Sequence, residues 1–80
     1  MLTMYSTPWC GYCHRLAAQL DRERIPYQMV DIEQDAAAAQ YVTSVNGGNR
    51  TVPTVRFPDG TTITNPSIAE VKARLAATLG

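Results

Sequence analysis

The chain has 80 residues, of which 45% are hydrophobic and 18% charged, and its seven basic residues balance its seven acidic ones. A chain this short buries only about 60% of the surface that it exposes when unfolded, so we expect one domain, residues 1–80, with a thin core. Without an excess of positive charge, nucleic acids and anionic membranes are not expected as partners.

The sequence also indicates where the protein is located and how its two cysteines are used. The longest uncharged stretch, between Asp35 and Arg50, is too polar to cross a bilayer, and Met1–Tyr5 lacks the basic and apolar regions of a secretory signal. We therefore expect a cytoplasmic protein in a reducing compartment. A disulfide between Cys10 and Cys13 would close too short a loop to stabilise the fold much, so this pair is expected to be reactive.

The first two expected elements are a strand and an amphipathic helix. Leu2–Ser6 is β-prone and is stopped by Thr7-Pro8. Beyond it, apolar side chains recur with the spacing of one helical face: Cys13, Leu16, Ala17 and Leu20. Polar side chains expected to face away from this stripe are Arg15, Gln19 and Arg22. Pro26 ends the helical region.

A second strand and a second helix follow. Tyr27–Ile32 has the composition of a strand, and Asp35 is placed to cap the next helix. The side chains expected on the buried face of that helix are Ala38, Tyr41, Val42 and Val45. Asn46-Gly47-Gly48 ends the helix with residues that accept positive φ.

The last third of the chain predicts a hairpin and a helix. Val52–Phe57 and Thr61–Thr64 are strand-like and flank a tight turn at Pro58-Asp59-Gly60. The helix begins either with Asn65 as cap and Pro66 in first position, or with Ser67 as cap and Glu70 completing a capping box. The residues expected in its buried stripe are Ile68, Val71, Leu75 and Leu79.

The order βαβαββα predicts an α/β fold. Two strands joined through a helix are expected to be parallel with a right-handed crossover, whereas the terminal hairpin is antiparallel. The expected architecture is a mixed four-stranded sheet sandwiched by three helices.

Cys10 and Cys13 lie where the first strand passes into the first helix. The unpaired N–H groups and the positive end of the helix dipole favour a thiolate there. The i, i+3 spacing brings the two sulfurs within bonding reach. We assign Cys10 as the nucleophile because it is expected to face solvent, and Cys13 as the resolving cysteine because it opens the apolar stripe. This placement is typical of thioredoxin-like redox proteins.

Two other uses of the motif stay open. Zinc needs four ligands, and beyond Cys10, Cys13 and His14 the chain has no other Cys or His, so only a site shared between chains would be complete. We expect no metal. Cys10 to His14 also matches the attachment motif of c-type haem, although no second His exists and no Met lies in the C-terminal part. His14 is otherwise expected on the solvent face of its helix.

Two motifs carry a resemblance to a known family. Tyr5–Cys13 and Thr51-Val52-Pro53 resemble the active-site and cis-proline motifs of glutaredoxins, members of the thioredoxin superfamily, and the resemblance extends over essentially the whole chain. Ser44–Val55 and Thr64–Ser67 most resemble mycoredoxins, the glutaredoxin-like proteins of organisms that use mycothiol. The resemblance implies a thioredoxin fold in a single glutaredoxin-like domain.

The resemblance also implies the reaction. We expect a monomeric disulfide oxidoreductase that removes mycothiol from mixed disulfides on proteins or small molecules. Mycothiol would be the reducing co-substrate, with no bound cofactor. Either Cys13 or a second mycothiol would release the thiol held on Cys10.

Several further residues are implied to bind the substrate. Pro53 would follow a cis peptide bond, and the backbone of Val52 would then pair with the bound thiol like a strand edge. Tyr12 would wall the groove beside Cys10, and Trp9 would contact the partner.

Differences from glutathione-dependent glutaredoxins concern the substrate. Those proteins commonly carry a Lys three residues before the nucleophile and a Gly-Gly-x-Asp segment before the last helix, where this chain has Thr7 and Thr64-Asn65-Pro66-Ser67. Hydroxyl and amide groups suit sugar hydroxyls better than an amino-acid zwitterion. Asn65 and Ser67 are therefore expected to bind mycothiol, an uncharged pseudodisaccharide thiol, although both are also good helix caps.

Two related functions also remain open. An electron donor of the NrdH-redoxin kind, reduced by thioredoxin reductase, would need both cysteines. Gly11 stands where many glutaredoxins have a proline between the cysteines, and some relatives without that proline hold an iron–sulfur cluster between two protomers.

Overall fold

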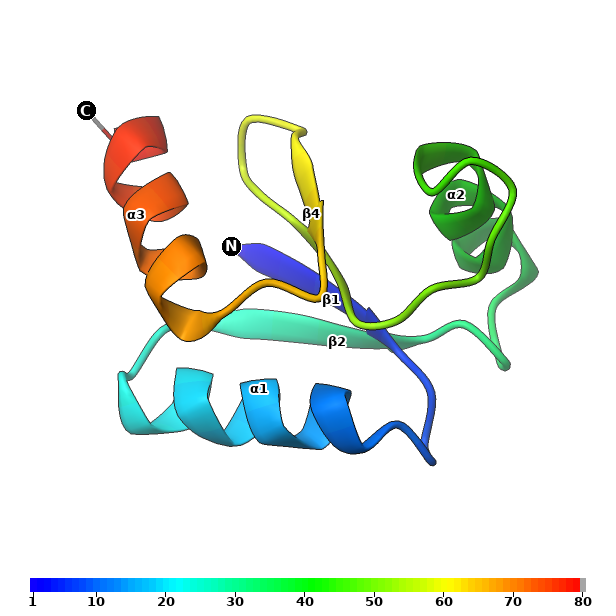
Figure 1. Ribbon diagram of the computed structural model, residues 1–80, viewed down its shortest axis with the longest axis horizontal. Helices are drawn as coiled ribbons and strands as arrows, with labels where there is room; N and C mark the ends of the chain where they lie inside the picture. The colour runs from blue at the N-terminus through cyan, green and yellow to red at the C-terminus, as the bar shows by residue number, and fades with distance from the viewer. Residues whose placement is uncertain (80) are drawn as a thin grey trace.

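The computed structural model describes residues 1–79 and has the expected element order (Figure 1). The elements are β1 Leu2–Ser6, α1 Gly11–Arg22, β2 Tyr27–Asp31, α2 Ala36–Val45, β3 Thr54–Arg56, β4 Thr62–Thr64 and α3 Ile68–Leu79. The expected burial of Leu79 lies outside the side chains that the structure describes, which are those of residues 1–77. No helix in residues 1–79 combines the length and apolarity needed to cross a membrane.

The sheet is mixed and has four strands in the order β2-β1-β3-β4. β1 runs parallel to β2, with Leu2 opposite Tyr27, and β3 is antiparallel to both of its neighbours. β3 is shorter than the predicted Val52–Phe57 strand, because Pro53 has no N–H to contribute to the ladder. The central position of β1 brings its C-terminal end, and the turn that follows, beside β3.

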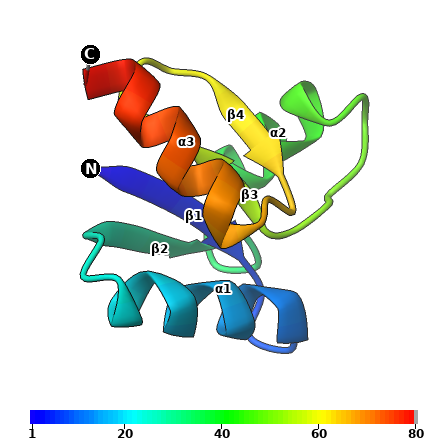
Figure 2. The ribbon, with the colours of Figure 1, turned by 60° about the vertical axis from the view of Figure 1, so that its left-hand side comes forward.

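The helices cover both faces of this sheet. α1 and α3 lie on one face and α2 lies on the other (Figures 1 and 2). Because side chains alternate along β1, Leu2 and Met4 face α1 and α3, whereas Tyr5 packs with Ala38, Ala39 and Val42 of α2. The thioredoxin-like architecture expected from the sequence is therefore confirmed.

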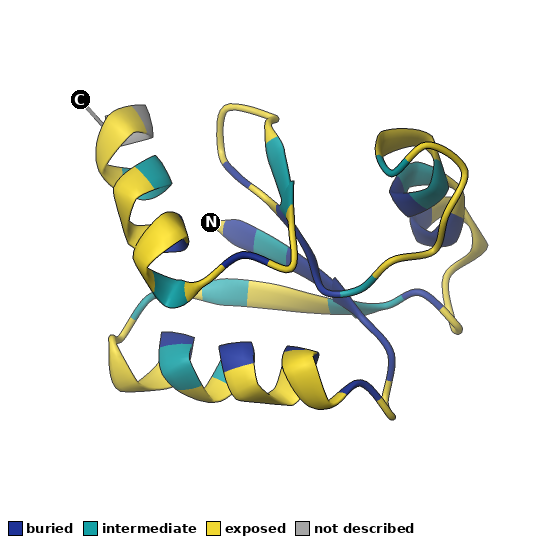
Figure 3. Ribbon diagram, in the orientation of Figure 1, coloured by how far each residue is buried: buried dark blue, intermediate teal, exposed yellow. Residues whose placement is uncertain are grey.

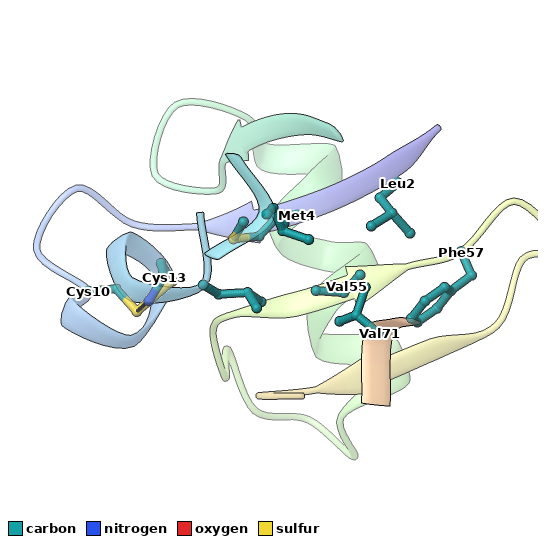
Figure 4. Close-up of a cluster of buried hydrophobic side chains, with 9 residues drawn as sticks. Leu2, Met4, Cys10, Cys13, Val55, Phe57 and Val71 are labelled. Carbon is teal, nitrogen blue, oxygen red and sulfur yellow. Dashed lines mark hydrogen bonds between the residues drawn. A yellow bond between two sulfur atoms is a disulfide. The ribbon is translucent and has the colours of Figure 1, made fainter. Parts of the chain in front are cut away.

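The larger core cluster lies between the sheet and the α1–α3 pair. Its buried members are Leu2, Met4, Cys10, Cys13, Leu16, Leu20, Val55, Phe57 and Val71. Burial is confined to the sheet-facing side of α1 (Figure 3). Cys10 and Cys13 thus belong to the core and lie at one end of the cluster (Figure 4).

The C-terminal end of α2 differs from the prediction. Asp35 caps the helix as expected, its Oδ1 accepting the N–H of Ala38 at 3.0 Å. The expected burial of Val45 is wrong: it is exposed, because it is the last helical residue and the chain then turns away. The positive φ angles occur at Gly47 and Gly48, whereas Asn46 has φ −115° and uses its side chain instead.

α3 begins with the second of its two expected caps. The Ser67 N–H donates to Glu70 Oε1 at 2.9 Å, and the Glu70 N–H donates to Ser67 Oγ at 3.0 Å. This reciprocal capping box satisfies two backbone donors of the first turn. Asn65 lies before it, in the left-handed region with φ 48°, where it redirects the chain from β4 into α3.

Candidate functional site

A disulfide joins Cys10 and Cys13 at the N-terminus of α1 (Figure 4). Cys10 caps the helix: its Sγ accepts the Cys13 N–H at 3.1 Å, and its own N–H donates to the Thr7 carbonyl at 3.2 Å. A backbone N–H directed at a sulfur favours the thiolate of that sulfur over the thiol. The geometry thus favours Cys10 as the thiolate of the pair.

Both cysteines are buried in this form. Cys10 is 6% exposed and Cys13 is 1% exposed. The expectation that Cys10 faces solvent is therefore wrong for the oxidised protein. The reason is that its sulfur is bonded to Cys13, which lies in the core, while the turn from Thr7 folds the backbone of Cys10 against the cluster. Cys10 is still the more accessible of the two.

Large exposed aromatic side chains flank the disulfide. Trp9 is 72% exposed, and its Nε1–H donates to Glu33 Oε2 at 3.2 Å. Tyr12 is 64% exposed. His14 is exposed as expected, and its Nε2 lies 2.7 Å from the Pro8 carbonyl, so the ring nitrogen donates and steadies the turn before Cys10.

A groove of about 400 Å³ runs between α1 and α3, beginning beside the cysteine motif. Its lining residues are Tyr12, Arg15, Leu16, Gln19, Asn65, Pro66, Ser67, Ile68 and Glu70. This α1–α3 groove brings together three of the expected substrate-binding residues, Tyr12, Asn65 and Ser67. It also contains Arg15 and Gln19, which the sequence analysis placed on the outward side of the helix.

The loop before β3 is tied to the wall of this groove. The Val52–Pro53 peptide bond is cis, Pro53 is buried and Val52 is half-buried. The Asn65 N–H donates to the Pro53 carbonyl at 2.7 Å. This hydrogen bond joins the segment that leads into α3 to the cis-proline loop.

Asn46, at the end of α2, also forms hydrogen bonds near this loop. Its Nδ2 donates to Thr54 Oγ1 at 3.0 Å, and its Oδ1 accepts a hydrogen bond from the Thr64 hydroxyl. Thr54 Oγ1 in turn donates to the Thr51 carbonyl at 2.7 Å. From the sequence, Asn46 is expected only to end α2, because nothing in the sequence shows that the end of α2 lies against β3 and β4.

A second cavity, of about 280 Å³, lies on the opposite flank of α1, toward β2. Its lining residues are Ser6, Thr7, Pro8, Cys13, His14, Met29 and Asp31. Thr7 is 5% exposed, and its Oγ1 has no hydrogen-bond partner among residues 1–79. Thr7 therefore lines this α1–β2 pocket, whereas Asn65 and Ser67 line the α1–α3 groove.

The clearly shifted pKa values belong to residues outside the α1–α3 groove and the α1–β2 pocket. Burial raises the pKa of Tyr27, helped by its hydrogen bond with Asp21. Hydrogen bonds from Thr61 lower the pKa of Asp59 in the β3–β4 turn. Within the described range, no group of three or more His, Cys, Asp or Glu side chains is placed to hold a metal ion.

The sequence is similar to those of known proteins that carry the name glutaredoxin or mycoredoxin. The family model described as Glutaredoxin matches residues 2–63. A protein of Mycobacterium tuberculosis named as a glutaredoxin is 62% identical over 79 residues, covering 99% of this chain and 94% of that protein. Mycoredoxin 1 of Corynebacterium glutamicum is 50% identical over 76 residues, covering 95% of this chain and 94% of that protein.

Solved structures show the same fold. A thioredoxin-like protein has a TM-score of 0.77 at 23% identity, covering 91% of this chain and 97% of its own. The buckwheat glutaredoxin–glutathione complex has a TM-score of 0.71 at 30% identity, covering 98% of this chain and 74% of its own.

Proposed function

The chain belongs to the glutaredoxin family, and from that premise we propose that it removes mycothiol from mixed disulfides, using a second mycothiol as the reductant. It is a glutaredoxin-like oxidoreductase with a Cys-x-x-Cys pair. The observation that carries the proposal is the capping of Cys10 Sγ by the Cys13 N–H, beside the groove that holds Asn65 and Ser67.

The proposed reaction begins with the Cys10 thiolate. It attacks the mycothiol sulfur of the mixed disulfide, forming a disulfide between Cys10 and mycothiol, and the target sulfur leaves as a thiolate that takes up a proton. A second mycothiol thiolate then attacks the mycothiol sulfur on Cys10. This step releases the symmetric mycothiol disulfide and restores the Cys10 thiolate.

Cys13 provides the second route of release. If its thiol loses a proton and attacks Cys10 Sγ, mycothiol leaves and the Cys10–Cys13 disulfide forms, which is the state that the structure holds. Reduction of this disulfide by two thiols completes the cycle. In our proposal the disulfide is thus an intermediate of the reaction.

Two observations support mycothiol over glutathione. The relative with 50% identity is named Mycoredoxin 1. The groove beside Cys10 presents amide and hydroxyl groups from Gln19, Asn65 and Ser67, with one cation and one anion, so its lining carries no net charge. Such a lining suits an uncharged thiol with many hydroxyl groups. Since these low-molecular-weight thiols act in reducing compartments, we also propose a cytoplasmic location and mycothiol-capped proteins as partners.

The test uses a peptide whose cysteine carries mycothiol, with excess mycothiol as reductant. Cys10→Ser is expected to lower the rate of release at least about a thousandfold, since it removes the nucleophile. Cys13→Ser is expected to retain activity within about tenfold, because mycothiol itself can release the intermediate.

Each alternative has its own outcome. Activity that survives Cys10→Ser would reverse the two cysteine roles. Loss of activity in both variants, together with reduction of the wild-type disulfide by thioredoxin reductase and NADPH, would identify the protein as a reductase-driven electron donor. In that case the mycothiol proposal would be wrong.

A further inference from the structure

We infer that the α1–α3 groove is the subsite for the pseudodisaccharide part of the thiol, and that Arg15 and Gln19 of α1 determine its selectivity. The inference rests on the proposed function and extends it to residues outside the motifs. It starts from the position, lining and hydrogen bonding of the groove.

The groove starts within the cysteine motif, at Tyr12, and runs along α1 as far as Gln19. Tyr12, between the two cysteines, forms one end, and Asn65 ties the facing wall to the Pro53 carbonyl. From Tyr12 to Gln19 the helix rises about 10 Å, or two turns. A substrate whose sulfur is bonded to Cys10 therefore has room to extend two linked rings along α1.

The lining matches the surface of a sugar. Leu16 and Pro66 are buried and Ile68 is half-buried, so they form an apolar floor between the polar side chains of the rims. Sugar rings likewise have apolar C–H faces and polar hydroxyl edges. The exposed ring of Tyr12 offers an aromatic face at the sulfur end. The volume of about 400 Å³ falls within the range of small-molecule sites, roughly 300–1,000 Å³.

Arg15 and Gln19 supply donors that the fold itself does not use. They are four residues apart and thus share one side of α1. Neither side chain makes a hydrogen bond or an ion pair within residues 1–79. Elsewhere on the chain, by contrast, Lys72 pairs with Glu23 at 2.7 Å and Arg74 donates to Thr61 at 3.0 Å.

The opposite wall supplies the matching acceptor. Glu70 Oε1 accepts the Ser67 N–H, which fixes the carboxylate in place across from α1. A hydroxyl can donate to Glu70 while accepting from Arg15, so a neutral polyol uses both sides of the groove. A carboxylate would be attracted by Arg15 but repelled by Glu70, whereas a hydroxyl can hydrogen-bond to both. The groove is therefore expected to prefer a hydroxyl-rich ligand over one whose only charges are carboxylates.

The test compares two caps on one peptide: mycothiol, and 2-mercaptoethanol, which has no sugar. The quantity of interest is kcat/KM for the mycothiol cap divided by kcat/KM for the small cap. Arg15→Ala and Gln19→Ala are each expected to lower this ratio about fivefold to tenfold, the effect of one lost hydrogen bond. The loss is expected in KM, because a groove contact binds ground state and transition state alike.

Matched variants lie outside the groove. Arg22→Ala removes an exposed arginine from the last turn of α1, and Gln40→Ala removes an exposed glutamine from α2. Both are expected to keep the wild-type ratio. Alanine is a strong helix former, so none of the four changes should weaken its helix, which circular dichroism would verify.

The outcomes separate the two proposals. If the wild-type protein shows no preference for the mycothiol cap, the proposed function is wrong. If it shows the preference but Arg15→Ala and Gln19→Ala leave the ratio unchanged, or lower both rates equally, the groove is not the sugar subsite while the proposed function stands.

Discussion

The two flanks of the N-terminal half of α1 are built differently. The polar side chains that line the α1–α3 groove are exposed or half-buried, and its α3 wall is held by hydrogen bonds that involve Asn65, Ser67 and Glu70. The α1–β2 pocket is smaller and contains Cys13 together with Thr7, a buried hydroxyl without a partner in the described part of the chain.

In our proposal, the substrate binds in the groove on one flank, and Cys13, which releases it, lies in the pocket on the other. The groove side presents fixed polar groups to solvent, as a binding surface must, and it lies beside Tyr12. The pocket side is lined by Cys13, whose sulfur bonds only to Cys10 in our proposal. Substitutions that remove hydrogen bonds from the groove wall should therefore act differently from a substitution of the unpartnered Thr7 hydroxyl in the pocket.

Removing the hydrogen bonds of the Asn46 side chain should lower the stability of the protein the most. Asn46→Ala loses the bonds to Thr54 and Thr64 and leaves their hydroxyls with fewer partners. We expect the free energy of unfolding to fall by about 2 kcal/mol. Denaturant unfolding of the oxidised protein measures this change.

The control for that variant is Asn49→Ala. The exposed Asn49 side chain makes a single, longer bond of 3.4 Å to the Asn46 carbonyl, so its removal should change stability by less than about 0.5 kcal/mol. Equal stability of the two variants would show that the Asn46 network does not hold the groove wall.

A smaller loss is expected at the start of α3. Ser67→Ala removes the side-chain half of the capping box and should lower stability by about 1 kcal/mol, visible as a lower Tm. Ser44→Ala in α2 provides the comparison, because that exposed hydroxyl only bonds back to the Tyr41 carbonyl at 2.7 Å. If Ser67→Ala and Ser44→Ala melt together, the capping box adds nothing to stability.

The smallest effect belongs to the pocket side. Thr7→Val replaces the unpartnered hydroxyl with a methyl group of similar size, so the oxidised protein should be unchanged or up to about 1 kcal/mol more stable. Thr54→Val is the matched change at a buried threonine whose hydroxyl is bonded to Asn46 and Thr51, and it should destabilise. A comparable loss in both variants would mean that Thr7 has a partner in solution.

Most of the fold could be predicted from local signals in the sequence. Apolar periodicity located α1, proline and glycine located the turns, and Asp35 located the start of α2. The order of elements, with the crossover rule, then predicted the mixed sheet. The errors fall at the ends of elements: β3 begins only after Pro53, and Val45 is exposed because burial there depends on where the chain turns next.

The site was harder to predict than the fold. The position of Cys10 and Cys13 at a strand-to-helix junction could be read locally, but the exposure of Cys10 depends on its redox state and on the turn from Thr7. The separation of Thr7 from Asn65, and the gathering of Arg15 and Gln19 beside α3, depend on tertiary contacts. An i, i+4 pair of polar residues beside Tyr12 was the only local signal for the latter.

The most direct test of mycothiol as the reductant uses Trp9. It is the only tryptophan, it adjoins Cys10 in sequence and it is largely exposed, so opening of the disulfide should change its emission. Oxidised protein is mixed separately with mycothiol, with glutathione, and with thioredoxin reductase plus NADPH, and the rate of the emission change is followed. Our account predicts the fastest reduction with mycothiol; reduction by the reductase alone would contradict it.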